Sequence, residues 1–439
     1  MSSMKTCALA ITAALVAASG ADAQQVVLSA DLDRPAVRAG RTQRAFLRVN
    51  LRGQALDGGP RERAPVNVAI VLDRSGSMQG AKLEAAKEAA IAAIRRLDER
   101  DFVSVVAYDS TVQTIWRSQR LTNPQAAERA VRSIRARGNT ALFAGVSRGA
   151  RELRRTWSRD RVNRIVLLSD GLANVGPSSP GALARLGRSL AREGITVTTL
   201  GLGLSYNEDL MSQLAAASDG SHAFIEREAE LARIFDAEFG DILSVVAQDV
   251  NVDVEFVGDA RPIRVLGREA YISDGRVRTR LNQIFGEQDK YIVVEVELPP
   301  IALDAQRTIA EVSVNYHDLG SRSTRQDRRS VNVTGTDSPA VIEARSNRDV
   351  LVIVSDLLAA EEIEQAVALN DQGRIDEAER VLQRSAARLG RDARRYNSRR
   401  LRRRSATQMR AAPELRRRPS RARRALRADQ NQAIFNRAY

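Results

Sequence analysis

Residues 73–77, Asp-Arg-Ser-Gly-Ser, bring one carboxylate and two hydroxyl side chains into a single short turn. Asp73 offers a hard carboxylate oxygen, Ser75 and Ser77 offer hydroxyl oxygens, and Gly76 allows the turn to stay tight. Oxygen ligands of this kind suit a hard cation such as Mg²⁺, which prefers octahedral coordination. Three ligands from one turn cannot fill six positions, so we expect others from elsewhere in the chain.

Two further oxygen ligands follow along the chain. Thr140 lies in the run RGNTAL, in a short loop between two helical patterns. Asp170 follows the apolar run RIVLLS, which predicts a buried strand. The carboxyl ends of the strands in an open α/β sheet share one edge, so Asp170 is expected at the same edge as Asp73.

The elements around these residues alternate between strand and helix patterns. Residues 66–72 are almost entirely apolar, which is typical of a strand buried on both faces, and residues 81–97 repeat apolar positions at helical spacing. The pattern continues, and alternating strands and helices predict a parallel α/β sheet. The later strands are expected at 102–108, 196–204 and 222–226, and the later helices at 124–136, 206–218 and 229–246.

The motifs DRSGSM, GNTAL and LLSDG together resemble the metal-ion-dependent adhesion site of von Willebrand factor type A domains. The resemblance covers residues 64–247 and implies a doubly wound, mostly parallel sheet whose usual activity is binding. It also implies that Mg²⁺, or alternatively Mn²⁺ or Ca²⁺, takes an Asp or Glu carboxylate of a protein partner at an open position. The metal ligands that it implies are Asp73, Ser75, Ser77, Thr140 and Asp170.

The sequence offers no recognisable catalytic group, so we expect a protein that is not an enzyme. Residues 145–149, GVSRG, fit the nucleophile pattern of hydrolases, but Ser147 lies within a helical run and not at a strand-to-helix turn. The two histidines, His222 and His317, stand in no catalytic pattern. A hydrolase would require catalytic residues that these patterns do not supply.

Residues 1–23 predict a secretory signal peptide, with Lys5, a short apolar stretch and an Ala-Asp-Ala cleavage motif. Cys7, the single cysteine, lies inside this segment, so the mature chain is expected to carry neither thiol nor disulfide. We expect a periplasmic or extracellular protein. The longest later apolar run, at 350–360, is broken by Asp356, so no transmembrane segment is expected.

Strand patterns lie both before and after the central domain. Residues 24–62 and 248–340 alternate apolar and polar side chains, which predicts an antiparallel β-sandwich. The economical arrangement is one sandwich into which the α/β domain is inserted. Inter-α-trypsin inhibitor heavy chains, which this order resembles, also place β structure on both sides of such a domain.

The C-terminal part is helical and then basic. Residues 343–390 resemble one helical hairpin of a tetratricopeptide repeat, and we expect a small helical appendage. From residue 388 to the end there are 18 arginines and three acidic residues, a net charge of +15, whereas the whole chain carries +14. Residues 391–439 are therefore expected to form a disordered tail that attaches to an anionic envelope surface. Nucleic acid is not favoured, because aromatic residues do not alternate with the basic ones.

These patterns predict an exported protein that binds a partner through a divalent metal. An alternative stays open, an envelope scaffold or assembly factor in which the metal is structural and the helical and basic segments make the contacts.

Overall fold

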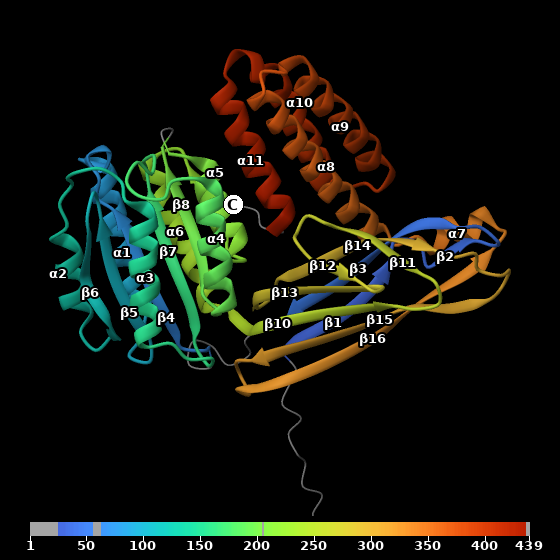
Figure 1. Ribbon diagram of the computed structural model, residues 1–439, viewed down its shortest axis with the longest axis horizontal. Helices are drawn as coiled ribbons and strands as arrows, with labels where there is room; N and C mark the ends of the chain where they lie inside the picture. Colours follow the sequence, from blue (N-terminus) through green and yellow to red (C-terminus); the bar gives the residue numbers. More distant parts are fainter. Residues whose placement is uncertain (1–24, 56–62, 204–205, 436–439) are drawn as a thin grey trace, which may run out of the picture.

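The computed structural model describes residues 25–55, 63–203 and 206–435, and the predicted signal peptide lies outside these ranges. Figure 1 shows an α/β domain, a β-sandwich and a bundle of C-terminal helices that rises between them. Within the described ranges no helix combines the length and apolar character that crossing a membrane requires.

The central domain is the predicted doubly wound sheet. Its strand order is β6-β5-β4-β7-β8-β9, with β6 antiparallel to β5 and the other pairs parallel. The strands are β4 (Val66–Asp73), β5 (Phe102–Tyr108), β6 (Val112–Arg120), β7 (Val162–Ser169), β8 (Thr196–Leu202) and β9 (His222–Ile225). The helices are the 3₁₀ turn η2 (Gly76–Met78), α1 (Ala81–Arg95), α2 (Pro124–Arg132), α3 (Leu142–Arg155), α4 (Pro180–Arg192), α5 (Glu208–Ala217) and α6 (Glu228–Leu243).

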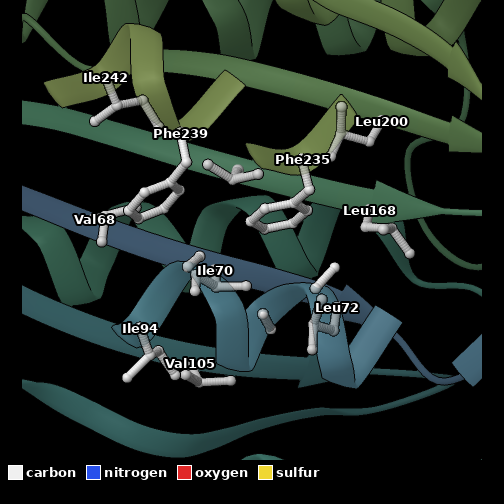
Figure 2. Packing of buried hydrophobic residues seen from close by; sticks show 14 of the residues in the cluster. Val68, Ile70, Leu72, Ile94, Val105, Leu168, Leu200, Phe235, Phe239 and Ile242 are labelled. Atoms are coloured by element: carbon white, nitrogen blue, oxygen red, sulfur yellow. The ribbon is translucent and has the colours of Figure 1, made fainter. Parts of the chain in front are cut away.

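Strand β4 is buried on both faces because its alternate side chains meet different helix layers. Ile70 and Leu72 belong to the core beneath α1, α2 and α6, and Figure 2 shows Phe235 and Phe239 of α6 over the same strand. Val71 faces the opposite layer, formed by α3, α4 and α5. This two-sided burial explains why the strand has no polar face, and it fixes where its carboxyl end emerges.

The strands before and after the α/β domain form one sandwich. Strand β3 pairs with β1 on one side and with β14 on the other, so distant segments share a sheet. The two sheets have the orders β1-β3-β14-β11 and β12-β13-β10-β15-β16-β2, and their inner faces share one apolar core. The strands are β1 (Val26–Leu32), β2 (Ala36–Arg38), β3 (Gln43–Gly53), β10 (Val245–Phe256), β11 (Arg261–Leu266), β12 (Tyr271–Ser273), β13 (Arg276–Phe285), β14 (Asp289–Leu298), β15 (Gln306–Asp318) and β16 (Ser323–Thr336).

The C-terminal region contains more helix than the single predicted hairpin at 343–390. After the short α7 (Pro339–Arg345), four long helices pack as a bundle: α8 (Arg348–Asp371), α9 (Ile375–Arg395), α10 (Arg399–Arg417) and α11 (Pro419–Phe435). This corrects the expectation of a disordered tail over residues 391–439, for the described part up to residue 435.

The basic segment folds because its few apolar residues recur at helical spacing and its inward arginines meet carboxylates. Leu401 and Leu415 of α10 and Leu426 of α11 are fully buried. Asp356 of α8, also fully buried, forms ion pairs with Arg400 and Arg404. Counting the charge of the segment alone could not reveal these partners, which lie on other helices.

Candidate metal-binding site

The candidate ligands meet at the carboxyl edge of the central sheet. Asp73 is the last residue of β4, and Asp170 follows β7, the strand that lies parallel beside it. Ser75 and Ser77 lie on the turn between β4 and α1, and Thr140 precedes α3. The structure therefore brings all five predicted residues to one edge.

Hydrogen bonds connect the oxygen atoms of this group. The backbone N–H of Ser75 donates to Asp73 Oδ1 over 2.8 Å, and the Ser75 and Ser77 hydroxyl oxygens lie 3.1 Å apart. The Ser77 hydroxyl donates to Asp170 Oδ1 over 2.7 Å. The side chain of Ser169 donates to Asp73 Oδ2 over 2.6 Å. The carboxylates of Asp73 and Asp170 are thus linked through Ser75 and Ser77.

The surroundings of Gly171 show that Thr140 lies close to the other candidate ligands. A Cβ atom built on Gly171 would lie 3.0 Å from Thr140 Oγ1, 3.6 Å from Ser77 Oγ and 3.7 Å from Asp73 Oδ2. Oxygen atoms of two separate loops therefore lie close to Gly171 on a third loop, and a side chain at residue 171 would enter the space between them.

The loops that carry the site are bonded to one another. Gly76 N–H donates to the Gly138 carbonyl over 2.9 Å, and Thr140 N–H donates to Asn174 Oδ1 over 2.8 Å. Gly138 has a φ of +67°, and a Cβ there would lie 2.9 Å from Ser110 Oγ, so this position requires glycine. These contacts fix the ligand-bearing loops relative to one another.

The electrostatics of the site favour a cation. Asp73 and Asp170 are fully buried, Ser75 and Thr140 are nearly so, and Ser77 is exposed at the mouth. Burial raises the pKa of Asp73 to about 6, against the lowering effect of the hydrogen bond from Ser169. Two buried carboxylates that are close together repel each other, and a bound cation would relieve that repulsion.

One positive side chain already stands at this edge. Lys82, in the first turn of α1, donates from Nζ to Asp170 Oδ2 over 2.5 Å, and its side chain is 27% exposed. It balances one of the two carboxylates. Neither Lys82 nor Ser169 was among the predicted site residues, although Ser169 directly precedes Asp170 and Lys82 follows the first motif by four residues.

A second group of ion pairs lies next to the turn that carries Ser75 and Ser77. Asp109, at the end of β5, accepts from Arg74 Nε over 2.7 Å and from Arg137 Nε over 2.9 Å. Burial would raise the pKa of Asp109, but the hydrogen bonds from Arg137, Thr111 and Arg74 outweigh it and lower the pKa to about 2. This carboxylate therefore stays charged and fixes the backbone on both sides of the candidate site.

The residues considered for catalysis are separated from one another. Ser147 donates to the Phe143 carbonyl within α3 over 2.8 Å, and His317 Nε2 lies 2.8 Å from Asp160. His222 is buried beside β8, where Thr199 Oγ1 lies 2.9 Å from its Nδ1. The described residues contain no cluster of three or more His, Cys, Asp or Glu side chains suited to a metal, and the candidate site has only two carboxylates.

Comparisons with known proteins agree with this fold. Residues 67–237 match the family model of the von Willebrand factor type A domain. The uncharacterized protein sll0103 of Synechocystis sp. is 30% identical over 293 residues, which are 64% of this chain and 68% of that protein. Human inter-alpha-trypsin inhibitor heavy chain H3 is 30% identical over 165 residues, 36% of this chain but only 18% of that protein.

Solved structures show the same architecture beyond the central domain. A von Willebrand factor type A protein from Catenulispora acidiphila matches with a TM-score of 0.70 at 20% identity, covering 87% of this chain and 90% of its own. The ArnB paralog VWA2 from Sulfolobus acidocaldarius matches with a TM-score of 0.62 at 16% identity, covering 94% and 98%. At such identities the likeness concerns the fold. Together with the family match and the relative from Synechocystis sp., it shows that the chain belongs to the von Willebrand factor type A domain family.

Proposed function

We propose that this chain is an exported, non-enzymatic protein that binds an acidic residue of a protein partner through a divalent metal. Proteins with von Willebrand factor type A domains typically mediate metal-dependent protein interactions, and this chain has the domain. The export rests on the signal-peptide pattern of residues 1–23.

The observation that carries the proposal is the convergence of five oxygen-bearing side chains from three loops on one volume. Asp73 and Asp170 would supply the charge, and the hydroxyl groups of Ser75, Ser77 and Thr140 would supply neutral oxygens. This donor set contains only hard oxygens, which fits Mg²⁺, and Mn²⁺ or Ca²⁺ as alternatives. When bound, the metal would supply the positive charge that attracts a carboxylate of the partner.

Residues of this chain determine how the metal site faces a partner. Ser169 and the Ser75 backbone N–H hold the two oxygens of Asp73, and Ser77 links the exposed mouth to Asp170. Because Ser77 is the exposed member of the set, a partner would approach from its side of the edge. The rigid loop contacts leave little to reorganise when the partner binds.

The test compares two ligand variants with a matched control. Asp73→Ala should abolish metal binding in calorimetric titrations with Mg²⁺ and Mn²⁺, and Thr140→Ala should weaken it. Ser147→Ala removes a hydroxyl from the same domain outside the site and should leave the titration unchanged. Capture of envelope proteins on the immobilised chain should follow the same order and should be lost with a chelator.

The scaffold alternative makes the opposite prediction about partners. If the metal is structural, Asp73→Ala should lower the melting temperature and leave partner capture intact below it. Capture that survives both the chelator and Asp73→Ala would contradict metal-mediated binding, whatever the titration shows.

A further inference from the structure

Two sets of arginines in the C-terminal bundle differ in their surroundings. Those that point inward are paired, and they fasten the bundle to itself and to the α/β domain. Arg423 of α11 forms ion pairs with Glu208 and Asp209 of α5 and with Asp371 of α8. These inward arginines help to explain why the segment folds, but they do not explain the exposed arginines that have no acidic partner.

The second set lies on the solvent side of α9 and α10, and we call its members the outward arginines. All are exposed, and within the described part of the chain none of them forms an ion pair with an acidic side chain. They are Arg380, Arg384, Arg391 and Arg394 on α9, and Arg399, Arg403, Arg410 and Arg417 on α10.

Helical spacing collects the outward arginines into two stripes. Arg380, Arg384 and Arg391 are separated by four and seven residues, which places them on one face of α9. Arg399, Arg403, Arg410 and Arg417 repeat on α10 with the same spacing of four and seven. The inner faces of the two helices carry different residues, among them Leu389 and Leu401, which are fully buried.

The two stripes lie on neighbouring helices. Helices α9 and α10 are joined by a short turn and pack closely, with the Ser405 hydroxyl donating to the Ala386 carbonyl over 2.8 Å. Helix α11 lies on the side of the bundle nearest the α/β domain, and α9 lies on the opposite side (Figure 1). The stripe on α9 is therefore carried by the helix of the bundle that lies on the far side from the domain with the candidate metal site.

An unpaired stripe of this kind is unfavourable for the isolated protein. Like charges four residues apart on a helix, such as Arg380 with Arg384 and Arg399 with Arg403, repel each other. An anionic ligand would neutralise these charges and relieve the repulsion. Phosphate suits this role, because guanidinium groups form paired hydrogen bonds with phosphate oxygens. A helix of about 20 residues is about 30 Å long, so the stripes match an extended array of phosphates better than a single small anion.

We propose that the outward arginines of α9 and α10 form a face that docks on a bilayer surface containing anionic phospholipid. The choice of a bilayer rests on the proposed export of the protein, whereas the basic face itself follows from the structure. Single-stranded nucleic acid is less well matched, because binding it uses aromatic stacking and neither stripe contains an aromatic side chain.

The experiment uses the full chain and two variants of equal charge. The face variant carries Arg384→Gln, Arg391→Gln, Arg403→Gln and Arg410→Gln. The control variant replaces four exposed arginines on other elements, Arg129→Gln, Arg151→Gln, Arg261→Gln and Arg307→Gln. The probe is sedimentation with vesicles of phosphatidylcholine, with and without phosphatidylglycerol, at two salt concentrations.

The wild type should bind the vesicles that contain phosphatidylglycerol and should release them at high salt, because added ions screen exposed charge. An arginine near an anionic bilayer strengthens binding about fivefold, so the face variant should bind at least roughly a hundredfold more weakly. The control variant should stay within a few fold of the wild type, and melting curves should agree among the three.

Two results would overturn the proposal. Equal weakening of vesicle binding in both variants would show that binding follows the net charge and not this face. A wild type that does not bind the vesicles but binds duplex DNA would assign the face to nucleic acid. The binding should be unchanged by a chelator and by Asp73→Ala. Failure here therefore leaves the metal-dependent partner binding untouched, and failure of that function leaves the vesicle result standing.

Discussion

Lys82 offers a test of the charge balance at the candidate metal site, through the substitution Lys82→Met. Its ammonium group contacts Asp170 Oδ2 at 2.5 Å, so any cation that approaches Asp170 meets a positive charge. Methionine keeps much of the length and the helix propensity of lysine and removes the charge. We expect the variant to bind Mg²⁺ more tightly than the wild type.

The magnitude is worked out for a cation bound about 4 Å from the ammonium group. Two unit charges about 4 Å apart interact by about 1 kcal/mol in water and by about 4 kcal/mol at an effective dielectric constant of 20. The charge of a divalent cation doubles these values. Because the Lys82 side chain is 27% exposed, we take the value for water, about 2 kcal/mol, which corresponds to roughly 30-fold tighter binding.

The metal-free variant should also be less stable. Asp170 is fully buried, and removing Lys82 leaves its carboxylate with the hydrogen bond from Ser77 but without its charged partner, which costs about 2 kcal/mol, as for other hydrogen bonds to charged groups. Mg²⁺ at a saturating concentration should then raise the melting temperature of Lys82→Met more than that of the wild type, since tighter binding to the folded state stabilises it further.

The assay is calorimetric titration with Mg²⁺, together with melting curves with and without the metal. Lys82→Arg keeps the charge and should leave the affinity close to that of the wild type. Lys87→Met removes a lysine from the same helix that pairs with Glu84, and should leave the affinity unchanged. If Lys82→Met binds Mg²⁺ no more tightly than Lys82→Arg, the ammonium group does not act on the metal and the reasoning is refuted.

Three further predictions concern the rest of the fold. Arg423→Ala should lower the free energy of unfolding by about 2 kcal/mol, because it removes charged hydrogen bonds to Glu208 and Asp209, which keep only their weaker pairs with Arg424 and Arg427, whereas Arg421→Ala at an exposed position should have little effect in the same denaturant titration. Burial lowers the pKa of His222 from its ordinary value of 6.5 to about 4, so the unfolded state takes up the proton first. Stability should fall by about 3 kcal/mol between pH 6.5 and pH 4, and His222→Gln should remove that part of the slope. A fragment of residues 248–340 should not melt cooperatively without residues 24–62, because β14 would lose its partner β3; cooperative melting of the fragment alone would show that the N-terminal strands are dispensable.

The candidate site could be predicted because its ligands lie in short motifs that end buried strands. Asp73 ends an apolar run that is typical of a strand buried on both faces, and Asp170 follows another. Parallel strands place their carboxyl ends at one edge, so two residues far apart in the sequence could be assigned to one site from the sequence alone. Thr140 was located by its motif and not by such an argument, since a loop between two helices has no fixed place.

The neighbours of the site were less accessible to sequence reasoning. Lys82 appears in the sequence as an ordinary charged residue of an amphipathic helix, and only the packing of α1 brings it to Asp170. The pairing of Arg74 with Asp109 is similar, because it joins the end of β4 to the end of β5. Contacts of this kind depend on the distance between elements, which hydrophobic periodicity does not determine.

The arginine-rich segment shows why net charge predicts disorder poorly when carboxylates lie elsewhere in the fold. Taken alone, residues 391–439 have too few apolar side chains to form a core, and that reasoning holds for an isolated chain. In the structure the missing stabilisation comes from Asp356 of α8 and from Glu208 and Asp209 of α5, which receive the inward arginines. The few apolar residues of α10 and α11 pack against the apolar residues of α8 and α9 and complete one core. Much of the charge left over lies on the outward arginines of α9 and α10, so part of the excess that suggested a disordered anchor belongs to a folded surface.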